Sequence, residues 1–92
     1  MQRRLVRRRV VVYGRVQGVF FRGSVTERAH ADGVAGWVAN RYDGAVEAIF
    51  EGPVEAVQRL VRFCETGPPH ARVERIEVRD EPLEGASGFA VR

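Results

Sequence analysis

A loop with two glycines, residues 14–22, joins an apolar run to a stretch with helical composition, and it constrains the fold more than any other feature. Residues 10–13 before it have the β-branched and aromatic composition of a buried strand. A chain that turns through glycines from a strand into a helix points several backbone N–H groups at one place, where the positive end of the helix dipole adds to them. The sequence therefore predicts an anion cradle here.

Arg22 closes this loop, and its planar guanidinium offers a fork of donors that matches two phosphate oxygens. The loop has neither the Gly-Lys-Ser/Thr ending of a nucleotide P-loop nor the spacing of the dinucleotide fingerprint. Taken alone, a strand-to-helix loop with glycines is more often a plain tight turn, and that alternative stays open at this point.

A second informative stretch covers residues 36–52 and carries a hairpin signal. Asp43 and Gly44 lie between two alternating apolar runs, and both tolerate the positive φ of a tight turn. Asn40 is then near a strand end, where its carboxamide offers a donor and an acceptor without charge, as the positioning of a water molecule requires. The competing interpretation is a turn-flanking Asn that bonds its own backbone.

The order of apolar patterns predicts an α+β fold. Strands are expected at about 8–15, 35–41, 45–51, 73–80 and 89–91, with helices at about 22–32 and 53–65. This βαββαβ order gives a ferredoxin-like two-layer sandwich, with two helices on one face of a mostly antiparallel sheet of four or five strands.

Helix ends and the core face follow from the same patterns. Gly33 and Gly67 are expected to end the two helices, while Ser24 and Glu27 spell a capping box that would start the first helix after the loop. The predicted core comprises Val10, Val12, Val46, Ala48, Phe50, Val57, Leu60, Val61, Ile76 and Val78.

Together, the two motifs resemble the acylphosphatase family. One family signature is Gly-x-Val-Gln-Gly-Val-x-aromatic-Arg, which residues 14–22 match, and the other begins Gly-aromatic-Val-x-Asn, which residues 36–40 match. The spaced glycines of the second signature fall in register at Gly44 and Gly52. The likeness continues through residues 67–73 to Gly88 and Phe89, so it covers nearly all of the chain.

The resemblance implies a hydrolase that cleaves the carboxyl–phosphate anhydride of acyl phosphates to a carboxylate and inorganic phosphate, without a metal or cofactor. It implies that Arg22 binds the phosphate and that Asn40 holds the water for in-line attack. The backbone N–H groups expected to cradle the phosphate belong to Gln17, Gly18, Val19, Phe20 and Phe21. At position 20 many relatives carry a smaller residue than Phe, a difference that we interpret as a change in the pocket wall.

Size and composition predict one domain over residues 1–92. We expect it to act as a monomer. The apolar runs are too short to cross a membrane and the start lacks the apolar core of a signal peptide, so we expect a cytoplasmic protein. Cys64 has helical spacing with apolar residues and is expected in the core, whereas His30 and His70 are expected at the surface. One Cys and two scattered His predict no metal site.

The charge is uneven along the chain. All 15 basic residues are Arg and the formal net charge is +3, with nine Arg against three acidic residues in residues 1–46 and six Arg against nine in residues 47–92. That field attracts anions. Residues 1–7 are expected to be a basic, loosely ordered start, and the clusters Arg3-Arg4 and Arg7-Arg8-Arg9 could alternatively bind nucleic acid. A non-catalytic ferredoxin-like module that binds phosphate or nucleic acid is therefore the competing function.

Overall fold

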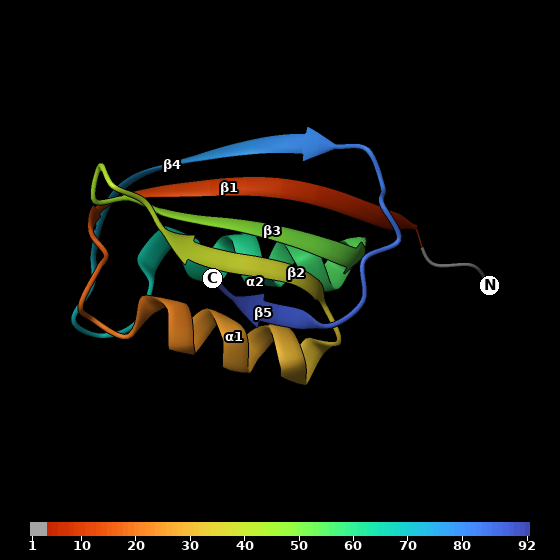
Figure 1. Cartoon of the computed structure of the whole chain (residues 1–92), viewed down its shortest axis with the longest axis horizontal. Helices are drawn as coiled ribbons and strands as arrows, with labels where there is room; N and C mark the ends of the chain where they lie inside the picture. The colour runs from red at the N-terminus through yellow and green to blue at the C-terminus, as the bar shows by residue number, and fades with distance from the viewer. Residues whose placement is uncertain (1–3) are drawn as a thin grey trace.

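The computed structural model describes residues 4–92, which form two layers (Figure 1). One layer is a five-stranded sheet of β1 (Leu5–Arg15), β2 (Ala35–Asn40), β3 (Val46–Pro53), β4 (Arg72–Glu81) and β5 (Phe89–Val91). Helices α1 (Phe21–Asp32) and α2 (Val54–Thr66) cover one face of that sheet. The strand order is β4-β1-β3-β2-β5, and only the β2–β5 pair is parallel. The predicted ferredoxin-like α+β fold is confirmed.

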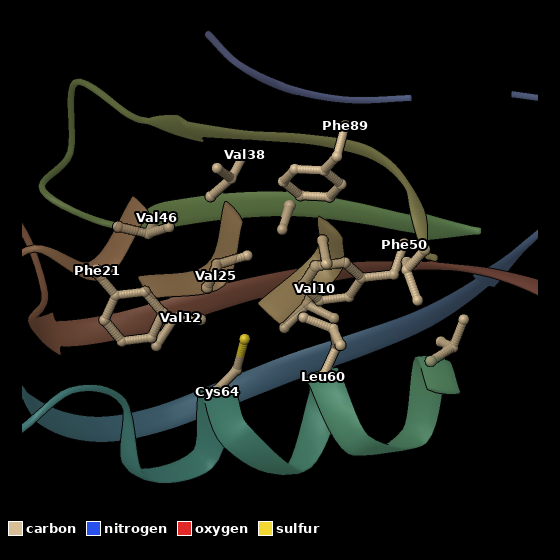
Figure 2. Close-up of a cluster of buried hydrophobic side chains, with 14 of the residues drawn as sticks. Val10, Val12, Phe21, Val25, Val38, Val46, Phe50, Leu60, Cys64 and Phe89 are labelled. Carbon is tan, nitrogen blue, oxygen red and sulfur yellow. The ribbon is translucent and has the colours of Figure 1, made fainter. Parts of the chain in front are cut away.

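The core lies between the sheet and the helices (Figure 2). Because successive strand residues point to opposite faces, Val10 and Val12 reach the helices, while Arg7 and Arg9 lie on the other face of β1. Of the predicted core, Val61 and Ile76 are only partly buried, and Val78 is 45% exposed. The prediction for Val78 is wrong because β4 is an edge strand, and water reaches its side chains from the unpaired edge.

The helix ends agree with the glycine predictions and disagree with the capping box. Gly33 adopts the left-handed conformation and its N–H caps α1, while Gly67 ends α2 with a φ of 71°. α1 begins at Phe21, without a side-chain cap. Ser24 lies inside the helix, where its N–H donates to the Phe20 carbonyl, so it cannot serve as the N-cap.

The ordered fold begins closer to the N-terminus than the sequence predicts. β1 starts at Leu5, which pairs with Pro53, and the N–H of Val54 donates to the Arg4 carbonyl. The expectation of a loosely ordered start is thus wrong for residues 5–7, because they form the first part of β1 and pair with residues 51–53 of β3. Residues 1–3 lie outside the described part of the chain. Within residues 4–92, no helix has the length and apolar character needed to cross a bilayer.

A buried carboxylate fixes the segment between β4 and β5. Arg7 Nη1 donates to Glu51 Oε1 at 2.8 Å, and both side chains are less than a tenth exposed. Glu51 also accepts hydrogen bonds from the backbone N–H groups of Glu84, Gly85 and Ala86. Burial opposes ionisation of this carboxyl, but the hydrogen bonds from Arg7 and the backbone outweigh it and hold the pKa of Glu51 below its ordinary 4.5.

We expect Glu51→Gln to lower the free energy of unfolding by about 3 kcal/mol at neutral pH, because Arg7 keeps its buried charge and loses its main partner. A carboxyl whose pKa is lowered by folding stabilises the protein above its ordinary pKa, and this contribution disappears as the pH falls through the folded-state pKa. The difference between wild type and variant should therefore narrow below pH 4.5. Urea unfolding across this range measures it.

The matched control is Glu77→Gln, which removes a carboxylate paired with Arg75 on the exposed face of β4. Water screens that pair, so its loss should change unfolding little. Equal effects of the two substitutions would mean that the Glu51 network adds nothing beyond an ordinary surface pair.

Candidate active site

The loop between β1 and α1 exposes a row of free backbone donors. Gly18 and Phe20 have positive φ values of 75° and 66°, while Val19 between them does not. Such alternation turns successive N–H groups toward one concavity. In the described residues, no carbonyl or side-chain acceptor takes the N–H groups of residues 17–21. The first turn of α1 carries no acidic residue, so its positive end is not neutralised.

Gly14 and two inward-pointing valines shape this loop. At Gly14 the pairing of β1 with β4 shifts register, and a Cβ there would collide with the Arg72 carbonyl. Two side chains of the loop point inward: Val16, just before the free donors, is buried, and Val19, among them, packs against the core. The packing of these side chains thus fixes the backbone of the loop against the core, while its N–H groups remain unpaired.

A pocket of about 310 Å³ opens beside these donors and brings together the two predicted catalytic side chains. Arg22 comes from the first turn of α1, and Asn40 is the last residue of β2, opposite Val46 of β3. The lining residues are Val16, Gly18, Phe20, Phe21, Arg22, Gly23, Asn40 and Val91. This volume is large enough for a phosphoryl group together with the organic group attached to it.

Arg22 is available for an anion. Its Nη1 donates to the main-chain oxygen of Arg92 over a long 3.5 Å, and no Asp or Glu side chain within residues 4–92 forms an ion pair with it. The arginines of β1 differ, because Arg7 pairs with Glu51, Arg8 with Asp80, and Arg9 with Glu47 and Glu81. The excess positive charge that the sequence places in the first half is therefore largely compensated along β1 but not at Arg22.

Gln17 has a role that the sequence does not reveal. Its side-chain Nε2 donates to the carbonyl oxygens of Arg41 at 2.8 Å and Ala45 at 3.0 Å. These carbonyls belong to the turn that follows Asn40, so the amide of Gln17 ties the donor loop to the segment that carries Asn40. The only sequence signal is the type of residue: a long amide with two N–H donors in a loop of small and apolar residues.

The β2–β3 turn is the hairpin that Asp43 and Gly44 predict. Gly44 has a φ of 91°, and the N–H of Arg41 donates to the Ala45 carbonyl at 2.8 Å. Asp43 accepts hydrogen bonds from the N–H of Ala45 and from the Arg41 guanidinium, which lower the pKa of its carboxyl. Asn40 itself makes no side-chain hydrogen bond to the described residues, so its carboxamide is free to bind a solvent molecule.

The remaining candidate groups lie away from this pocket. Cys64 is buried in α2 as predicted, and burial raises the pKa of its thiol to about 12. His30 and His70 are exposed, also as predicted, and His30 Nε2 lies 3.2 Å from the Phe89 carbonyl oxygen. Among residues 4–92, no group of three His, Cys, Asp or Glu side chains is arranged to hold a metal ion.

Comparisons with known proteins agree on one family. The acylphosphatase family model matches residues 8–91. An acylphosphatase of Rubrobacter xylanophilus is 62% identical over 91 residues, which cover 98% of this chain and 83% of that protein. The crystal structure of acylphosphatase from Bacillus subtilis is 42% identical, with a TM-score of 0.90, over 95% of this chain and 98% of its own. An acylphosphatase structure from Coxiella burnetii is 35% identical, with a TM-score of 0.93, over 100% and 99%.

Proposed function

The chain belongs to the acylphosphatase family, and from this premise we propose that residues 17–22 and Asn40 form the centre at which it hydrolyses acyl phosphates. The reaction converts the carboxyl–phosphate anhydride to a carboxylate and inorganic phosphate. The observation that carries the assignment of residues is the shared pocket, in which Arg22 and Asn40 from separate segments lie beside unpaired N–H donors.

The phosphoryl group is held by the loop. N–H groups of residues 17–21 and the Arg22 guanidinium bind its equatorial oxygens and spread the charge that develops in the transition state. Because these donors are fixed by the fold before substrate arrives, no reorganisation is needed at the moment of reaction. The carboxylate is a good leaving group, so positioning and charge stabilisation are what the protein has to supply.

Asn40 holds the attacking water in line with the bond that breaks. The water oxygen forms a new bond to phosphorus while the bond from phosphorus to the acyl oxygen breaks, and the electron pair leaves with the carboxylate. Asn40 is neutral and cannot accept the proton, and the pocket lining contains no carboxylate or imidazole. The proton of the water therefore passes to an oxygen of the substrate's own phosphate.

The tie between Gln17 and the hairpin turn supports this division of roles. Its two hydrogen bonds couple the position of the phosphate-binding loop to that of the strand end that carries Asn40. In-line attack depends on the distance between phosphorus and water, so a link of this kind fixes the geometry that the reaction needs. Because Arg22, Asn40 and the donor loop fill every role in the proposed reaction, the centre needs no second copy, and we propose that the protein acts as a monomer.

The test is the release of phosphate from acetyl phosphate and benzoyl phosphate by protein treated with a chelator. We expect turnover of both, with inorganic phosphate as a competitive inhibitor because it occupies the same cradle. Phosphate binding without turnover would instead indicate a non-catalytic phosphate-binding module. The nucleic-acid alternative is weakened because Arg7, Arg8 and Arg9, three of the N-terminal arginines on which it depends, are paired with carboxylates.

A further inference from the structure

Phe20 is presented to solvent at the rim of the pocket. Its side chain is 65% exposed, whereas Phe21, Phe50 and Phe89 are buried. It is also the one residue other than glycine with positive φ within residues 4–92. A residue with a Cβ is strained in that conformation, and an exposed phenyl ring gains nothing from burial in the free protein. Neither property is explained by the stability of the fold.

The neighbouring Gly23 makes room for this ring. A Cβ at position 23 would collide with Cε1 and Cζ of Phe20, so the ring lies directly over the Cα of Gly23 on the first turn of α1. Glycine weakens a helix relative to alanine. The ring thus lies over a helix surface that lacks a side chain, and it lines the pocket.

The polar groups of the pocket already have partners in the proposed reaction. Backbone N–H groups and Arg22 take the phosphoryl oxygens, and Asn40 takes the water. What remains of the lining is apolar, chiefly Phe20, Val16 and Val91, and what remains of the substrate is its acyl group. Because the ring of Phe20 is exposed and flat, it can cover an apolar acyl group as that group leaves water.

We propose that the Phe20 ring is the acyl-group contact of this enzyme and makes it favour acyl phosphates with aromatic or other bulky apolar acyl groups over acetyl phosphate. This inference rests on the proposed function and deepens it. The backbone of Phe20 contributes to the cradle and its side chain sets specificity. Gly23 acts as a positioning residue, since it determines where the ring lies.

The experiment measures the ratio of kcat/KM for benzoyl phosphate to that for acetyl phosphate. In Phe20→Ala this ratio should fall about tenfold, the usual discrimination from one apolar contact, and the loss should appear mainly in KM for benzoyl phosphate. Because the readout is a ratio, a general loss from disturbed loop geometry cancels. Inhibition by inorganic phosphate, which has no acyl group, should change less than the benzoyl phosphate KM.

Gly23→Ala provides an independent variant, because it keeps the ring but displaces it. The ratio should fall here as well. Tyr42→Ala is the matched control, since Tyr42 is a fully exposed aromatic side chain in the hairpin turn and does not line the pocket. Its ratio should equal that of wild type.

An unchanged ratio in Phe20→Ala, with or without an equal loss on both substrates, would overturn the inference. If circular dichroism shows that Phe20→Ala does not fold, an unchanged ratio in Gly23→Ala would overturn the inference instead. If only the inference about Phe20 fails, the wild-type protein still hydrolyses both substrates. If the proposed function fails, the wild-type protein releases phosphate from neither substrate.

Discussion

Arg22→Lys should lower kcat/KM for acyl phosphate hydrolysis by about a thousandfold, the scale on which arginines that stabilise phosphoryl transfer act. Lysine keeps the positive charge but loses the planar fork that binds two phosphate oxygens at once. The fold should remain intact, because the side chain of Arg22 forms no ion pair with Asp or Glu in residues 4–92 and makes one long hydrogen bond, to the main-chain oxygen of Arg92.

Steady-state kinetics with acetyl phosphate and far-ultraviolet circular dichroism together check this expectation. Competitive inhibition by inorganic phosphate should weaken in the same variant, since product and substrate share the cradle. Arg59→Lys is the control, because Arg59 lies on α2 and pairs with Asp32 outside the pocket. Catalytic efficiency near that of wild type in Arg22→Lys would remove Arg22 from the mechanism.

Asn40→Ala should separate water positioning from phosphate binding. We expect kcat to fall by about two to three orders of magnitude, a loss of roughly 3–4 kcal/mol in transition-state stabilisation. The inhibition constant of inorganic phosphate should change little, because Arg22 and the N–H groups of residues 17–21 remain in place. Measuring kcat and this inhibition constant in one variant therefore distinguishes the two roles. Normal kcat with much weaker phosphate inhibition would instead make Asn40 a phosphate ligand.

Local signals account for what the sequence predicts well. Glycines at positions 33 and 67 end the helices, and the Asp43-Gly44 pair makes the hairpin, because each acts through its own backbone conformation. The strand period of β1 identifies Val10 and Val12 as core residues, because successive side chains of a strand point to opposite faces of the sheet. The two motifs then give the candidate site residues, and Arg22 and Asn40 do line one pocket.

What the sequence misses depends on partners distant along the chain. Arg7 looks like solvated charge until the fold brings Glu51 to its side, and that pairing extends β1 toward the N-terminus. Gln17 meets carbonyl oxygens 24 and 28 residues away, so no local pattern reveals its tie to the hairpin. The roles of Arg22 and Asn40 in catalysis remain predictions, which the variants above test.

The unpaired N–H donors of the loop link the stability of the folded protein to the binding of a ligand. A molecule that binds only the folded state raises the free energy of unfolding by RT ln(1 + [L]/Kd), about 2.7 kcal/mol at a hundred times Kd. The cradle is made of backbone N–H groups that converge only when β1 and α1 are in place, so the unfolded chain cannot bind phosphate in this way. On the proposed assignment of this loop as the phosphate cradle, inorganic phosphate, the product of the reaction, should also raise the free energy of unfolding.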